Sequence, residues 1–256
     1  PYHLEKYGEL AVNYNRDVEI FPVLNAIFQK IEGESPYKSP TDMGVNMVGF
    51  AISDDEAVKD AAKQEIIRRY YSALVCERQG MSNETDSEKI ELLMKQVGAT
   101  VDDRPVVQYA IEKAETEGSP ATAIEMPDGK IITGKTSSLL GAASAMLLNA
   151  LKYLAGIDDS VNLISPTIIE PMQKLKTEIM GNHNPRLHTD EILIALSICA
   201  ATDDLAKSAL DNAYKLAGCE AHSSVILSGV DENVFRKLGV NLTCEPKYQT
   251  KKLYHN

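Results

Sequence analysis

The chain has 256 residues, of which 44% are hydrophobic and 25% charged, and its formal net charge is −11. This composition is that of an ordinary globular protein, and it excludes collagen-like and disordered chains. An acidic chain is a poor match for nucleic acid or for an anionic membrane surface, because both require clustered Lys and Arg. No run in the sequence approaches the roughly 20 apolar residues of a membrane helix. We therefore expect a cytoplasmic protein that has neither nucleic acid nor a membrane as a partner.

Residues 1–118 are predicted to form a helical domain. They carry 22 acidic and 13 basic side chains, whereas residues 119–256 carry 15 and 13. The balance changes at the breaker sequence Glu117-Gly118-Ser119-Pro120, where we place the domain boundary. Apolar residues recur at helical spacing before it. The expected helices cover approximately residues 18–31, 54–74, 84–97 and 102–117.

A long polar segment punctuated by prolines, residues 35–46, separates the first two expected helices. Long loops inside compact domains are uncommon and often functional. Asp42 and Asn46 in this segment are candidate ligand-binding residues. The alternative, that Thr41 and Asp42 only satisfy backbone groups at a turn, is equally compatible with the sequence.

Residues 119–256 are predicted to form an α/β subdomain. Residues 121–126 and 130–133 have the pattern of two strands around Asp128-Gly129, which is a strong hairpin signal. A strongly apolar helix is expected to follow at 138–155. Repeated helix–Gly–strand units then predict a sheet with helices on its faces. The other expected strands are 161–164, 223–227 and 240–243, and the other expected helices are 171–180, 189–201, 202–217 and 231–238.

The segment Gly129–Thr136 matches the phosphate-binding pattern G-x-x-x-x-G-K-[ST]. Asp128-Gly129 favours a hairpin turn instead, and the β-branched residues that follow favour a strand. We therefore prefer a hairpin to a phosphate loop. Lys135, Thr136 and Ser137 nevertheless remain candidate anion-binding residues, because they precede an expected helix whose N-terminus would attract an anion.

Cys219 and His222 form a C-x-x-H pair. A cysteine activated by a nearby histidine is a possible nucleophile, so both residues are candidate catalytic residues. The alternative is a buried structural thiol and a histidine that is hydrogen-bonded to the backbone. Zinc requires three or four convergent ligands, and the second half of such a pattern is absent from the sequence, so we predict no metal.

Several stretches together resemble a known family. They are Val12–Glu19, Tyr37–Asn46, Lys63–Tyr70, Leu193–Thr202 and the segment around Cys219 and His222. The chain resembles the bacterial domain-of-unknown-function family 1846, also called uncharacterised protein family 371. The resemblance implies a helical domain followed by an α/β subdomain with a mixed sheet of deaminase-like topology.

The resemblance also implies that the chain is a fragment, the C-terminal half of proteins about twice this length. A glycine-rich stretch of the family's N-terminal half would then be missing. The deaminase zinc signature H-x-E…P-C-x-x-C is absent, so deaminase chemistry is not carried over. The resemblance identifies neither a cofactor nor functional residues.

Two functions are compatible with these features. The first is a cytosolic enzyme half that binds an anionic or phosphorylated small molecule together with a missing N-terminal domain. The second is a non-catalytic oligomerisation module, favoured by the apolar helix expected at 138–155. In both cases we expect a homo-oligomer.

Overall fold

The structure, a computed structural model, describes residues 14–40, 43, 55–82 and 85–249, with side chains from residue 20 in the first helix and from residue 59 in the second. Contacts divide the chain into two compact units. Unit 1 comprises Pro1–Ala73 and Gly80–Arg104, and unit 2 comprises Leu74–Gln79 and Pro105–Asn256. The boundary predicted at residues 118 and 119 stays a prediction.

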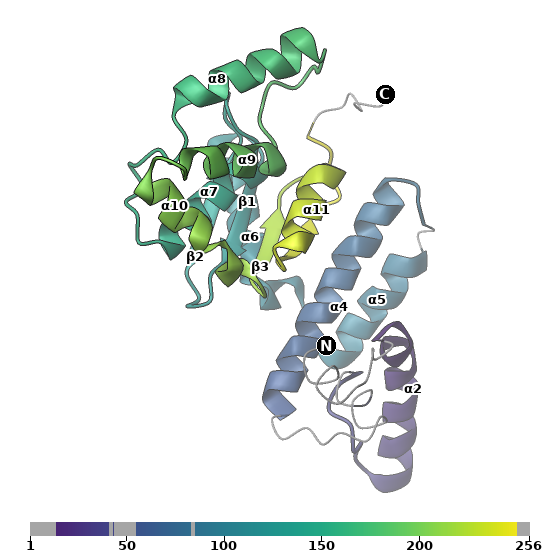
Figure 1. Cartoon of the computed structure of the whole chain (residues 1–256). Helices are drawn as coiled ribbons and strands as arrows, with labels where there is room; N and C mark the ends of the chain where they lie inside the picture. Colours follow the sequence, from purple (N-terminus) through teal and green to yellow (C-terminus); the bar gives the residue numbers. More distant parts are fainter. Residues whose placement is uncertain (1–13, 41–42, 44–54, 83–84, 250–256) are drawn as a thin grey trace. The chain divides into compact units, whose positions relative to one another are not determined.

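The described part of unit 1 is helical, as the apolar spacing predicts. Its elements are α2 (Tyr14–Glu32), most of α4 (Asp55–Arg78), α5 (Thr85–Val97) and the short 3₁₀ helix η1 (Val101–Asp103), labelled in part in Figure 1. Apolar side chains from these helices and the adjoining segments are buried between them. They include Phe21, Met43, Ala62, Ile66, Ile67, Leu93 and Met94.

Unit 2 contains a four-stranded mixed sheet in the order β2-β1-β3-β4. β1 pairs antiparallel with both of its neighbours, and β3 pairs parallel with β4. This confirms the α/β class and the mixed sheet that the resemblance implied. The strands are β1 (Ala121–Glu125), β2 (Ile131–Lys135), β3 (Glu220–Ser223) and β4 (Asn241–Cys244). The strand expected at 161–164 is wrong, because these residues form a bend instead.

Helices cover both faces of the sheet. α6 (Pro105–Glu117) packs against one face, where Val106 and Ala110 meet Ala123 of β1. On the other face, Ile124 and Ala221 join the main core. Successive residues of a strand point to opposite faces, so Ala123 and Ile124 separate into these two layers.

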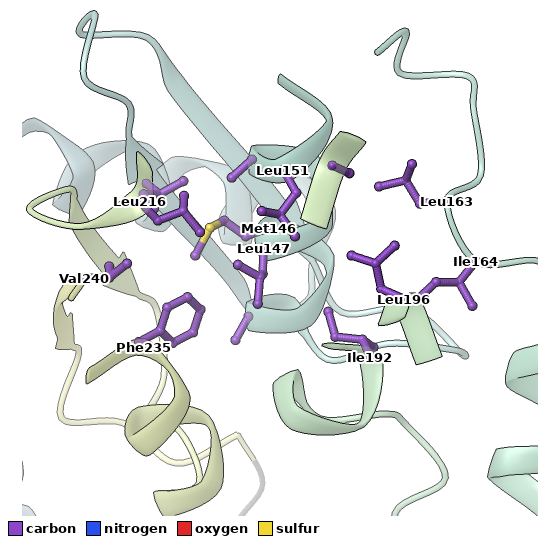
Figure 2. Packing of buried hydrophobic residues seen from close by; sticks show 14 of the residues in the cluster. Met146, Leu147, Leu151, Leu163, Ile164, Ile192, Leu196, Leu216, Phe235 and Val240 are labelled. Carbon is purple, nitrogen blue, oxygen red and sulfur yellow. The ribbon is translucent and has the colours of Figure 1, made fainter. Parts of the chain in front are cut away.

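α7 (Ala142–Leu154) supplies the centre of the main core. Figure 2 shows Met146, Leu147 and Leu151 of α7 together with side chains from α9 (Thr189–Cys199) and α11 (Gly229–Lys237). Ala206 and Ala209 of α10 (Asp204–Asp211) belong to the same cluster. The apolar helix expected at 138–155 is therefore buried within unit 2, although it begins only at Ala142.

Two glycines of the phosphate-loop pattern have structural roles. Gly129 adopts φ 81° in the tight turn between β1 and β2, and its N–H donates to the carbonyl of Met126 at 2.8 Å. Gly134 lies where β2 approaches α7 so closely that an added Cβ would come within 2.0 Å of the Met146 nitrogen. Residues 131–135 are a strand, so the pattern forms a hairpin, as the turn signal predicts.

Two prolines lie inside helices, although helix interiors usually exclude them. Pro22 is inside α2. Pro171 is inside α8 (Pro166–Lys174), which we expected to begin only near Pro171. α8 begins at Pro166, where the absent N–H would have had no partner, and Pro171 removes one hydrogen bond from the helix. The π-helical turn η2 (Leu175–Ile179) continues the same helical segment.

Candidate functional site

The polar segment singled out in the sequence lines a pocket of unit 1. Asp42 and Asn46 lie outside the described residues, but residues 35–40 are described. The pocket has a volume of about 360 Å³, within the usual range of small-molecule sites. α2, α4 and α5 supply the rest of its wall. The lining includes Phe21, Asn25, Gln29, Glu34, Ser35, Tyr37, Lys38, Ser39, Lys59, Lys63, Ile66, Gln96 and Val97.

Three lysines give this pocket its electrostatic character. Lys59 and Lys63 are four residues apart on α4 and therefore lie on one side of that helix, while Lys38 comes from the polar segment. Glu34 is the acidic side chain in the lining. The described pocket is thus richer in positive than in negative groups, although the whole chain carries −11.

Nothing in the sequence singles out Lys59 and Lys63 as candidate ligand-binding residues. Lysines four residues apart are typical of a solvated helix face, so their spacing carries no signal for a ligand site. Only the packing of α4 beside residues 35–40 turns them into lining residues. Of the buried apolar residues in the lining, Ile66 belongs to the predicted apolar stripe of its helix, whereas Phe21 was not among the residues of the predicted stripe.

Cys219 and His222 lie in the sheet region of unit 2, but the structure does not bring their side chains together. Cys219 precedes β3 and joins the main core with Ala221, whereas His222 is paired with Ala123, which faces α6. An odd spacing along an extended segment directs two side chains to opposite faces of a sheet. Burial raises the pKa of the Cys219 thiol, which disfavours the nucleophilic thiolate.

His222 is fully buried and has polar neighbours on its own sheet face. Its Nδ1 lies 2.8 Å from Thr243 Oγ1, and its Nε2 lies 3.4 Å from Glu245 Oε1. Hydrogen bonding to His222 is the main cause that lowers the pKa of Glu245. These neighbours are side chains, whereas the structural alternative expected hydrogen bonds between His222 and the backbone. The catalytic roles of Cys219 and His222 stay predictions.

Lys135, Thr136 and Ser137 do not lie at a helix N-terminus, because α7 begins at Ala142. Lys135 ends β2 and forms an ion pair with Glu117, and this contact, with one from Lys113, lowers the pKa of Glu117 to about 2. Ser137 Oγ accepts hydrogen bonds from the N–H groups of the turn that follows it. The anion-binding role of these three residues stays a prediction.

The residues that the structure describes contain neither a cluster of metal-binding side chains nor a membrane-spanning helix. No three His, Cys, Asp or Glu side chains of that part of the chain gather closely enough to hold a metal ion. Likewise, none of the helices in the described ranges is long and apolar enough to span a membrane.

The fold defines an α/β protein with a helical unit. The chain belongs to the family of domain of unknown function DUF1846: the model of its N-terminal domain matches residues 1–98, and that of its C-terminal domain matches residues 102–254. The prediction that the chain holds only the family's C-terminal half is therefore wrong, since the model of the N-terminal domain matches residues 1–98.

Relatives of this family carry the name UPF0371 protein. The chain is 58% identical to one from Corynebacterium efficiens, 56% identical to one from Corynebacterium urealyticum and 55% identical to one from Streptococcus pyogenes. Each match covers 99% of this chain and 51% of the relative. The chain thus spans about half the length of the curated relatives it matches.

Proposed function

We propose that unit 1 binds an anionic or phosphorylated small molecule in the pocket beside residues 35–40. The observation that carries the proposal is the presence of Lys38, Lys59 and Lys63 in the lining of one pocket of about 360 Å³. Lysine is a common ligand of phosphate groups, since its ammonium acts as a compact point charge with three donors.

The other lining residues fit a ligand that has polar and apolar groups in addition to its anionic group. The amides of Asn25, Gln29 and Gln96 can donate and accept hydrogen bonds, and Phe21 provides apolar surface. Small-molecule sites combine an apolar wall with a few polar groups that fix orientation. A phosphorylated metabolite has both of these chemical features.

The experiment measures the thermal unfolding of the chain with inorganic phosphate, glucose 6-phosphate or unphosphorylated glucose. Ligands that bind the native state stabilise it, by about 2.7 kcal/mol at a hundred times their Kd. We expect a rise in Tm with the phosphorylated sugar, and none with glucose. Lys59→Ala and Lys63→Ala should each reduce the rise.

Lys89→Ala is the matched control, because Lys89 is an exposed lysine of α5 outside the pocket lining. It should leave the ligand-dependent rise unchanged. An equal loss of binding in Lys89→Ala would indicate nonspecific charge attraction and contradict a site in this pocket. No rise with either phosphate compound would contradict the proposed ligand class.

A second candidate function, self-association, is favoured by one specific observation. The helical segment of α8 and η2 exposes an apolar stripe, in which Ile168, Leu175 and Ile179 are 37%, 49% and 78% exposed. With the half-buried Met172, the stripe has spacings of four, three and four residues. This is the spacing of a coiled-coil seam, which can pack against the same seam of a second copy.

Sedimentation velocity of the chain at increasing concentration tests this candidate. We expect reversible dimers that Leu175→Glu abolishes, because a charge in the middle of such a seam would be buried. Leu205→Glu, at an exposed apolar position of α10, is the control and should leave dimerisation intact. A wild-type chain that stays monomeric throughout would contradict self-association.

A further inference from the structure

A polar cluster in unit 2 lies outside every candidate that the sequence indicated. It forms where residues 186–188 lead into α9 and where α11 begins. His188 is the N-cap residue of α9, Ser228 is the N-cap residue of α11, and Asp231 lies in the first turn of α11. The two helices contact each other within this unit, as Figure 1 also indicates.

The carboxylate of Asp231 receives four hydrogen-bonding groups, although it is only 6% exposed. Its Oδ1 accepts from the N–H and from the hydroxyl of Thr189, each at 2.9 Å. Its Oδ2 accepts from the Ser228 hydroxyl at 2.7 Å and lies 2.9 Å from His188 Nδ1. Burial opposes ionisation of Asp231, but the hydrogen bonds from His188 and Thr189 outweigh it and lower its pKa.

An ionised carboxylate can only accept, so Nδ1 of His188 must be the donor in this pair. The contact therefore fixes the tautomer: Nδ1 keeps its proton, and Nε2 carries the lone pair whenever the ring is neutral. None of the hydrogen bonds among residues 85–249 involves Nε2, and the His188 side chain remains 30% exposed.

The backbone at His188 is held by a second set of contacts. Glu191 Oε2 accepts the His188 N–H at 2.7 Å and also the ammonium of Lys176 at 2.7 Å. Lys176 is buried and donates in addition to the carbonyl of Arg186 at 2.6 Å. His188 is thus held at its ring by Asp231 and at its backbone by Glu191.

We propose that His188 is a proton-transfer group, which acts through Nε2 on a small molecule with a weakly acidic hydroxyl or a leaving oxygen. In one direction the Nε2 lone pair takes the proton of the ligand hydroxyl, so that the ring becomes an imidazolium and the ligand an oxyanion. In the other, the imidazolium returns that proton to a leaving oxygen. Asp231 is the positioning residue that stabilises the imidazolium.

The geometry excludes Ser228 as the nucleophile of a Ser-His-Asp triad. Its hydroxyl donates to Asp231 and lies 3.4 Å from Nδ1, the nitrogen that already faces the carboxylate. In a triad the serine must be hydrogen-bonded to the other ring nitrogen. The cluster therefore has the histidine–carboxylate pair of a general acid–base site, without its own nucleophile.

The charged groups around His188 set the pH range of this chemistry. Its hydrogen bond to Asp231 raises the pKa of His188 from 6.5, with a further contribution from the charge of Glu191, while burial and Lys176 oppose the rise. The imidazolium, which is the proton donor of the pair, therefore persists to higher pH than in a free imidazole.

A test on the unmodified chain is ¹⁵N NMR of the histidine rings across a pH titration. We expect Nδ1 of His188 to stay protonated throughout, and Nε2 to lose its proton with a pKa above 6.5. The neutral tautomer with the proton on Nε2 would overturn the proposal, because that nitrogen could not then act as a base. This measurement requires neither a variant nor a known ligand.

The second test uses p-nitrophenyl acetate as a probe of imidazole reactivity. We expect His188→Gln to reduce the protein-dependent release of p-nitrophenolate about tenfold. The pH profile of the wild-type rate should follow the NMR titration of His188. His183→Gln, at an exposed histidine of the same segment, is the control and should retain most of the rate. An unchanged rate in His188→Gln, with its backbone spectrum intact, would overturn the proposal.

Discussion

Units 1 and 2 bury apolar surface in different ways. In the described part of unit 1, helices pack side by side and leave a polar pocket between them and residues 35–40. Unit 2 instead has a sheet covered on both faces, with one continuous cluster that extends from Ile124 of β1 to Phe235 of α11 (Figure 2). Elements from distant parts of the chain meet in that cluster.

This difference in packing indicates which unit can bind a ligand or lose a side chain at a small cost in stability. A helical unit with a pocket already has room for a ligand. When a side chain at the pocket wall is removed, water can enter the vacated space, and the loss of stability is smaller. A closely packed sheet core has no such room, because interiors are packed to crystal-like density. Polar chemistry in unit 2 is accordingly found at helix ends, as in the cluster around His188 and Asp231.

The largest expected effect compares one phenylalanine from each unit. Phe235→Ala should destabilise unit 2 by about 4 kcal/mol, because its ring is fully buried in the main core. Phe21→Ala should cost about 2 kcal/mol in unit 1, because Phe21 borders the pocket and its removal enlarges an existing hollow. Hydrogen exchange of the amides of each unit in denaturant measures both values. Equal losses of stability in the two variants would show that the two cores are equally closely packed.

The next largest effect probes the close approach of β2 to α7. Gly134→Ala should destabilise unit 2 by about 3 kcal/mol, because the new Cβ would clash with the backbone of Ala145 and Met146. Gly229→Ala is the control, since an added Cβ there meets nothing within 4 Å and the backbone φ is not positive. Urea denaturation measures both. A tolerated Gly134→Ala would mean that α7 can move away from the sheet.

An intermediate effect concerns the pH dependence of unit 2. The lowered pKa of Asp231 contributes stability that is present above its unfolded value of 3.8 and is lost as pH falls through the folded value. The raised pKa of His188 contributes stability that is present below 6.5 and is lost as pH rises through its folded value. From this pair we expect greatest stability between about pH 4 and pH 6.5.

Variants of this pair separate the two limbs of the pH profile. Asp231→Asn should flatten both limbs and lower the maximum by about 2 kcal/mol, since donors of His188 and Thr189 lose a charged acceptor. His188→Gln should remove the alkaline limb and only reduce the acid limb, since Thr189 and Ser228 still donate hydrogen bonds to Asp231. Denaturant midpoints measured at several pH values check these shapes, and an alkaline limb that persists in His188→Gln would assign it to another group.

The smallest expected effect is that of Lys135→Ala. Lys135 forms an exposed ion pair with Glu117, and exposed pairs contribute little because water and salt screen them. The denaturation midpoint should stay within experimental error of the wild type. We also expect no loss of phosphate binding, since Lys135 is outside the pocket lining. A clear loss would instead support the anion-binding role predicted for Lys135, Thr136 and Ser137.

The sequence alone determined most of the elements. Helical spacing located α4 and α5 within a few residues, and Asp128-Gly129 located the hairpin of β1 and β2. These features were predictable because helical periodicity and turn preference depend on residues that are close in the sequence. The family was also identifiable from the sequence, because several unusual stretches occur together.

Only the tertiary structure decided which side chains share a site. Cys219 and His222 are neighbours in sequence but belong to opposite faces of the sheet region. His188 and Asp231 are 43 residues apart in the sequence. They form a hydrogen bond because α9 and α11, whose N-terminal ends carry them, pack against each other. Lys59 and Lys63 gain a role through the segment packed beside α4. Contacts between residues that are distant in sequence depend on how helices and strands pack against one another. Local sequence patterns do not predict that packing.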